Sequence, residues 1–104
     1  EKYMFKKIIV PLEELQYKLG SIDNKYLINE GNRALGLFAA IAGTAIQPQI
    51  SPQDVCFYVL EGSIEILTDD KIFAMKAGDM VLIPKTSAFN IKFIENSKIF
   101  TVRF

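Results

Sequence analysis

Short segments of alternating apolar and polar residues follow one another along the second half of the chain. Glycine, asparagine and aspartate separate these segments, and such residues tolerate the backbone conformations that a chain reversal needs. The segments themselves are rich in isoleucine, valine, phenylalanine and tyrosine, which favour strands. The pattern therefore predicts strands over residues 25–28, 55–60, 63–68, 71–76, 80–83, 89–94 and 98–104.

Two earlier segments have a less regular pattern. Residues 12–15 follow Pro11 and are expected to form one helical turn, which depends on tertiary packing because it is so short. Residues 33–42 are rich in alanine and suit a helix, but Gly36 would cost a helix about 1 kcal/mol. A turn signal at residues 29–32 also requires a partner for the strand before it, so we predict a strand here.

Many short antiparallel strands must hide their edges, and closing the sheet or doubling it as a jelly roll does so. The prediction is thus an all-β fold, an antiparallel jelly-roll barrel. The chain has 104 residues with no linker-like stretch, so residues 1–104 are expected to form one domain. Eight phenylalanines and four tyrosines provide material for its core.

Charge and composition limit the classes of partner that we expect. Twelve basic residues balance twelve acidic ones, so we expect binding neither to nucleic acid nor to an anionic membrane surface. The longest apolar stretch, residues 34–42, falls short of the roughly 20 residues that a membrane span needs. Cys56 is the only cysteine and lies between apolar residues, where a buried free thiol is expected. That thiol suits a reducing, cytoplasmic location.

A first series of residues at fixed spacing runs from Gly43 to Gly62, in the middle of the chain. Gly43 is followed by five residues and then by residues 49–51, Gln-Ile-Ser. Three more residues lead to Val55, and six more lead to Gly62. A glycine at position 62 permits a tight reversal between two strands.

A second series begins at residues 78–79, Gly-Asp, and continues through residues 83–84, Ile-Pro, to Phe89. Gly78 again permits a tight reversal, and Pro84 lacks an N–H group, so it marks the end of ladder pairing. With both series the chain resembles the cupin superfamily over about half its length. The resemblance implies a cupin barrel for the whole chain.

In the family that the chain resembles, three histidines and one glutamate point into the barrel and hold a divalent metal. The matching positions here are Gln49, Ser51, Val55 and Phe89, and the chain contains no histidine. An amide and a hydroxyl are poor ligands for iron, manganese or zinc, and aliphatic and phenyl groups donate nothing. We therefore expect no metal and no other cofactor.

The same positions are candidates for a pocket. Period-2 geometry is expected to place Gln49, Ser51, Val55, Phe57 and Val59 largely on one face, with Phe89 meeting them from the facing strand. An apolar floor with two polar groups is typical of a small-molecule site. The alternative is that Val55, Phe57 and Phe89 only fill the barrel. Gln49 and Ser51 each need a ligand, a water or a backbone partner if they lie inside.

The last strand contributes a further candidate. Phe100, Val102 and Phe104 alternate with Thr101 and Arg103, so the apolar set is expected to face a core. Arg103 would then either reach solvent or guard the barrel mouth. The pocket candidates are thus Gln49, Ser51, Val55, Phe57, Phe89 and Arg103.

Residues next to these candidates are assigned other surroundings. Cys56 and Tyr58 should face the opposite way from Phe57, against a second sheet or a subunit. Asp54 should point away from the side of Val55, and Glu61, beside a turn, is expected to be solvated.

Two functions remain open. The first is a metal-free protein of the cupin type that binds a small organic molecule or serves as a structural or regulatory subunit. The alternative is a metal-independent isomerase, epimerase or lyase acting on a polar metabolite, by similarity to ethanolamine-utilisation cupins. Tyr58 and Glu65 are its proton-carrier candidates, but without histidine no catalytic residue is assigned and the balance is against an enzyme. A mean hydropathy of +0.20 further suggests a homodimer.

Overall fold

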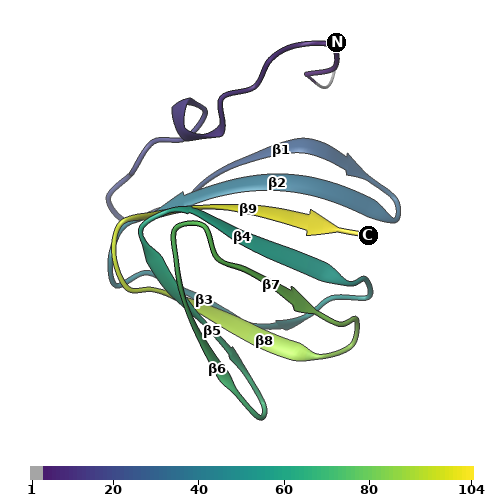
Figure 1. The fold of residues 1–104 in the computed structure, drawn as a ribbon, viewed down its shortest axis with the longest axis vertical. Helices are drawn as coiled ribbons and strands as arrows, with labels where there is room; N and C mark the ends of the chain where they lie inside the picture. Colours follow the sequence, from purple (N-terminus) through teal and green to yellow (C-terminus); the bar gives the residue numbers. More distant parts are fainter. Residues whose placement is uncertain (1–3) are drawn as a thin grey trace.

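The computed structural model describes residues 4–104, and their regular structure is almost entirely antiparallel β-sheet. A five-stranded sheet has the order β1-β2-β9-β4-β7, and a four-stranded sheet has the order β3-β8-β5-β6. The two sheets form the layers of a barrel, and the N-terminal segment, residues 4–21, runs outside the five-stranded sheet near β1 and β2 (Figure 1). The predicted all-β antiparallel fold is confirmed. The elements are η1 (Pro11–Glu13), β1 (Asp23–Glu30), β2 (Arg33–Ala40), β3 (Ala45–Ile50), β4 (Val55–Glu61), β5 (Ser63–Thr68), β6 (Ile72–Lys76), β7 (Met80–Ile83), β8 (Ala88–Phe93) and β9 (Ser97–Arg103).

Most strands lie where the pattern predicted them. The alanine-rich segment containing Gly36 is strand β2, which pairs with β1 and with β9. Strand β3 was not predicted, because it contains Pro48 and few strongly apolar residues. It is an edge strand whose register shifts between Ile46 and Gln49, and proline is tolerated at such places. No helix within residues 4–104 has the length and apolarity to cross a membrane.

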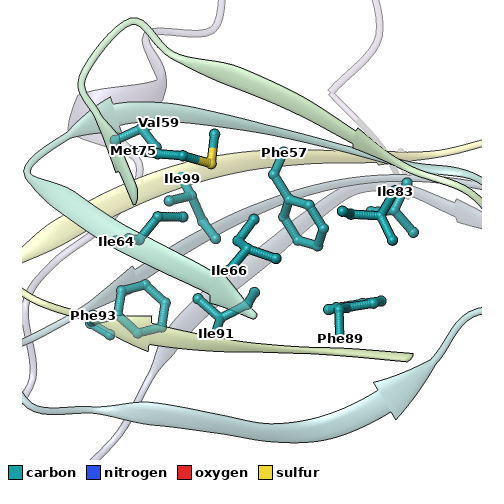
Figure 2. Packing of buried hydrophobic residues seen from close by; sticks show 12 residues of the cluster. Phe57, Val59, Ile64, Ile66, Met75, Ile83, Phe89, Ile91, Phe93 and Ile99 are labelled. Atoms are coloured by element: carbon teal, nitrogen blue, oxygen red, sulfur yellow. The ribbon is translucent and has the colours of Figure 1, made fainter. Parts of the chain in front are cut away.

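Apolar side chains from both sheets meet in the space between the two layers (Figure 2). Those that are less than 2% exposed in this cluster are Ala40, Val59, Ile64, Ile66, Ile91, Phe93 and Ile99. We call the end of the barrel at Gly62 and Ser97 the closed end. The opposite end, at Ser51, Phe89 and Arg103, is called the open end. The core is concentrated toward the closed end, and this leaves the open end to be lined differently.

The outer face of the five-stranded sheet is apolar as well, because the N-terminal segment covers part of it. Leu15, 3% exposed, packs there against Leu37 and Phe100. Phe100 of the apolar set therefore faces a core, but this core lies on the outer face of the sheet and not between the two sheets. Residues of the alternate set, Ile99, Thr101 and Arg103, point inward, whereas Phe104 is 59% exposed.

Polar contacts hold the N-terminal segment in place. The hydroxyl of Tyr17 donates a hydrogen bond to the carboxylate of Glu61, so the expectation of a simply solvated Glu61 is wrong. Burial, and then the bond to Glu61, raise the pKa of the Tyr17 hydroxyl. Lys98 donates from Nζ to the backbone oxygen of Leu12 at 2.8 Å. The segment is thereby tied to both β4 and β9.

The turn at the closed end has little free space. Gly62 has a φ of +85°, and a Cβ atom there would lie 2.3 Å from the backbone oxygen of Asn96. The fully buried Ser97 accepts a hydrogen bond from the N–H of Ser63 at 3.0 Å. Its hydroxyl also lies 2.9 Å from the Ser63 carbonyl oxygen and 2.8 Å from that of Glu95. The glycine in the first series is thus required by both conformation and space.

Candidate functional site

A cavity of about 320 Å³ opens between the two sheets at the open end. It draws residues from both layers and from the bend that joins β3 to β4. Its lining residues are Ile22, Asn24, Tyr26, Phe38, Ile46, Gln49, Ile50, Ser51, Pro52, Val55, Phe57, Phe89, Ile91, Ile99, Thr101 and Arg103. All six pocket candidates from the sequence border this one cavity.

The three apolar candidates form its floor. Val55 and Phe57 project from β4 and Phe89 from β8, so they approach from opposite sheets, and each is at most 5% exposed. Figure 2 shows Phe57 and Phe89 facing each other across the space between the sheets. The rings of Phe57 and Phe89 meet edge to face with centroids 5.3 Å apart. Such contacts stabilise beyond simple burial. These three side chains are therefore part of the core, and they also line the cavity.

Gln49 and Ser51 reach the cavity by a different route from the one expected. They come from β3 and the bend after it, and not from a strand face shared with Val55. The expectation of one shared face is wrong because residues 51–54 carry the chain from one sheet to the other. Gln49 instead pairs in register with Phe89. The Ser51 hydroxyl accepts a hydrogen bond from the N–H of Gln53 at 3.0 Å.

Arg103 lies at the mouth of the cavity, at the end of β9. Its Nη2 is 3.4 Å from the hydroxyl of Tyr26, and the guanidinium carbon is 5.9 Å from the centre of the Tyr26 ring. Asp54 lies on the neighbouring strand end but turns its carboxylate to the N–H of Lys85, at 2.8 Å. In the part of the chain that the structure describes, no carboxylate forms an ion pair with Arg103.

Three polar lining residues were not predicted from the sequence: Asn24, Tyr26 and Thr101. Asn24 and Tyr26 are alternate residues of β1, which contains none of the spaced positions. The pairing of β1 with β2 in a hairpin was the signal from which their place in the barrel could have been inferred. Thr101 lies two residues before the pocket candidate Arg103 on β9, and the face that the two residues share was the available signal. Thr101 is 8% exposed, and its hydroxyl has no hydrogen-bond partner within residues 4–104.

The four positions that match metal ligands do not fit a transition metal. Val55 and Phe89 carry no donor atom, and the Ser51 hydroxyl is a weak neutral donor already bonded to backbone. Only the neutral amide of Gln49 remains. No three His, Cys, Asp or Glu side chains gather as a metal-ligating group among residues 4–104.

The proposed proton carriers lie away from the cavity. Tyr58 is on the outer face of the five-stranded sheet, where it borders an apolar hollow of about 370 Å³ that includes Ile9 of the N-terminal segment. Glu65 alternates with the buried Ile64 and Ile66 of β5 and so faces outward. Neither residue lines the open-end cavity.

Comparisons with known proteins agree with this architecture. The family model described as "Cupin domain" matches residues 36–100. A search of curated proteins found no match. A solved protein of unknown function from Streptococcus pyogenes is 17% identical with a TM-score of 0.91, covering 99% of this chain and 90% of its own.

Two further solved structures extend the likeness. A cupin superfamily protein from Desulfitobacterium hafniense is 15% identical with a TM-score of 0.88, covering 100% of this chain and 95% of its own. A cupin 2 conserved barrel domain protein from Leptotrichia buccalis is 25% identical with a TM-score of 0.84, covering 88% of this chain and 45% of its own. Likeness at these identities concerns the fold.

Proposed function

Because the chain belongs to the cupin domain family, we propose that it is a metal-independent cupin that binds a small organic molecule at its open end. The family predicted from the glycine spacing is thereby confirmed. The cavity of about 320 Å³ carries the proposal, since small-molecule sites range from roughly 300 to 1,000 Å³. Its apolar floor and the unpartnered hydroxyl of Thr101 have the composition of such a site.

Thermal denaturation in the presence of added compounds tests this function. Organic acids, sugars and their derivatives should be screened beside manganese, iron, nickel and zinc salts. A ligand that binds only the folded state raises the midpoint temperature, so an organic compound should raise it and the metals should not. A rise of several degrees with one equivalent of any of these metals would contradict metal independence.

We further propose a homodimer, in which the chain serves as a structural or regulatory subunit. A row of apolar residues supports this proposal. The row crosses the outer face of the five-stranded sheet, from β2 through β9 and β4 to β7, and consists of Leu35, Val102, Cys56 and Leu82. Leu82 is 62% exposed although it is large and apolar. Sedimentation at micromolar concentration should show a dimer that Leu82→Asp converts to a monomer. Only monomer in the unmodified chain would refute it.

The enzymatic alternative, a metal-independent isomerase, epimerase or lyase, has less support. Acid–base chemistry needs a proton carrier within hydrogen-bond reach of the substrate. Tyr58 and Glu65 do not border the cavity, and Tyr26 is the lining residue with a phenol.

A reducing, cytoplasmic compartment is part of the proposal. Cys56 is a buried free thiol, and burial raises its pKa. A raised pKa keeps the group as the thiol, which is much less reactive than the thiolate.

A further inference from the structure

Among residues 4–104, the wall of the open-end cavity carries one cation and no anion. Arg103 is the only charged one of the described residues that line it. The ion pairs within residues 4–104 join other side chains, Lys18 with Asp23, Lys25 with Glu14, and Arg33 with Glu30. A half-buried cation without a counter-charge is costly, so the site favours a ligand that brings a negative charge.

The surroundings of Arg103 favour a planar anion. The guanidinium lies over the Tyr26 ring and makes one long hydrogen bond to its hydroxyl, which leaves most of its N–H groups free. A guanidinium presents these donors as a fork that matches the two oxygens of a carboxylate. The Tyr26 hydroxyl accepts from Arg103, so its own hydrogen is available to an anion beside it.

Thr101 provides an independent polar contact deeper in the cavity. It precedes Arg103 by two residues on β9, so both side chains project from the same face, about 7 Å apart along the strand. The residue is 8% exposed, and no protein group among the described residues bonds its hydroxyl, which is accessible from the cavity and not sealed in the core. A polar group of a ligand can therefore bond this hydroxyl in place of solvent.

Charge balance separates a carboxylate from a phosphate. No lysine or second arginine of the described part of the chain lines the cavity, so a phosphate carrying up to two negative charges would be left partly uncompensated. The single charge of a carboxylate matches Arg103. At roughly 30 Å³ for a water-sized group, a cavity of about 320 Å³ accommodates about ten non-hydrogen atoms.

We propose that the ligand is a small monocarboxylic acid with an apolar body. Its carboxylate binds Arg103 and Tyr26, its body packs on Phe57 and Phe89, and a hydroxyl or carbonyl along the body bonds Thr101. This inference rests on the proposed function, because it names the class of molecule that the cavity takes.

Isothermal titration of the full chain tests the carboxylate directly. Hexanoate, benzoate and cinnamate are compared with hexanamide, benzamide and cinnamamide, which keep the shape and lose the charge. We expect at least one acid to bind about tenfold more tightly than its amide, as for a hydrogen bond to a charged group. Arg103→Gln should remove that difference.

Arg33→Gln is the matched control, because it removes the same charge from an exposed arginine that is paired with Glu30 and does not line the cavity. It should leave the binding of every acid unchanged. Loss of binding in this control would mean that net charge alone attracts the acids, and would overturn the assignment to Arg103.

The role of Thr101 is tested with cinnamate and 4-hydroxycinnamate. The hydroxylated acid should bind about fivefold more tightly to the unmodified chain, and Thr101→Val should abolish this advantage. Equal affinity of the two acids, with 6-hydroxyhexanoate also no better than hexanoate, would remove Thr101 from the ligand contacts.

The other outcomes of these titrations show whether the carboxylate proposal fails alone or together with small-molecule binding. Amides that bind as tightly as the acids would overturn the carboxylate and leave small-molecule binding standing. Phenyl phosphate binding more tightly than benzoate would overturn the carboxylate in favour of a phosphate. An absence of heat and of thermal stabilisation with every acid, amide and phosphate would count against both.

Discussion

Two hydroxyls on the same face of β9 have opposite surroundings. Ser97 at the closed end is fully buried and has three hydrogen-bond contacts, whereas Thr101 toward the open end is 8% exposed and has none within residues 4–104. The same strand and the same alternation place both inside the barrel. One end of the barrel is therefore complete as a folded core, and the other has polar groups left for something else to satisfy.

Two phenylalanines of β8 offer the largest test of this difference. Phe93 is 1% exposed in the closed-end core, and Phe89 is 5% exposed beside the cavity. Phe93→Ala should lower the free energy of unfolding by about 4 kcal/mol, because it leaves a hole in tightly packed surroundings. Phe89→Ala should cost about 2 kcal/mol, because it only enlarges a space that exists already. Equal losses in urea denaturation would show that both ends are packed alike.

Glycines at two turns give the next effect. Gly62→Ala should cost about 3 kcal/mol, because a positive φ is combined with a Cβ atom 2.3 Å from a backbone oxygen. Gly78 also has a positive φ, of +94°, but nothing lies within 4 Å of a Cβ there. Gly78→Ala should therefore cost only about 1 kcal/mol of backbone strain. Chemical denaturation of both variants measures the difference, and similar costs would mean that the crowding at Gly62 relaxes.

Removing the hydroxyl of Ser97 tests how completely the closed end is hydrogen-bonded. Ser97→Ala should lower the free energy of unfolding by about 2 kcal/mol, since it leaves the buried N–H of Ser63 without its acceptor. Urea denaturation measures the loss. Stability within experimental error of the unmodified chain would indicate that a water replaces the hydroxyl.

The corresponding change at the open end should have the opposite sign. Thr101→Val keeps the shape and removes a hydroxyl with no partner, so it should raise the free energy of unfolding by about 1 kcal/mol without ligand. Thr101→Ser keeps the hydroxyl and is the control, which should not gain stability. Destabilisation by valine would place a tightly held water or backbone partner on Thr101.

Tyr17 provides the smallest effect and the one that depends on pH. Its pKa is raised in the folded protein by burial and by Glu61, so folding favours the neutral hydroxyl. The contribution of the Tyr17 hydroxyl to the free energy of unfolding is fully present below the ordinary pKa of about 10 and is lost as the pH rises above that value. Tyr17→Phe should be about 0.5 kcal/mol less stable at pH 8, with the gap closing above pH 10 or so. A gap that stays constant in denaturation at both pH values would contradict the raised pKa.

Local pattern was sufficient to predict most strands, because turn residues and alternation act over a few neighbours. Strand β3 escaped prediction since Pro48 and polar residues suit only an unpaired edge, and edge position is a property of the whole sheet. Apolar residues occupy both faces of β9, so alternation alone could not show which of the two faces lies inside the barrel. Only the N-terminal segment on the outer face, with Leu15 against Phe100, explains that composition.

Four of the pocket candidates came together because the spaced series marks inward positions at the mouth of the barrel: Gln49, Ser51, Val55 and Phe89. The partners of Arg103 did not follow from that spacing, since Tyr26 reaches it through the pairing of β1 with β2 and of β2 with β9. Distances across three strands depend on register and cannot be read from neighbouring residues.

The two walls of the cavity differ in how firmly their backbones are held. Strand β9, which carries Thr101 and Arg103, is hydrogen-bonded on both sides, by β2 and by β4. Opposite it, Gln49 and Ile50 belong to the edge strand β3, whose ladder is interrupted near Pro48. A bound acid would thus contact a rigid wall at its carboxylate and a more flexible wall along its apolar body. Under the proposed function, such a barrel would discriminate between ligands sharply by charge and loosely by length.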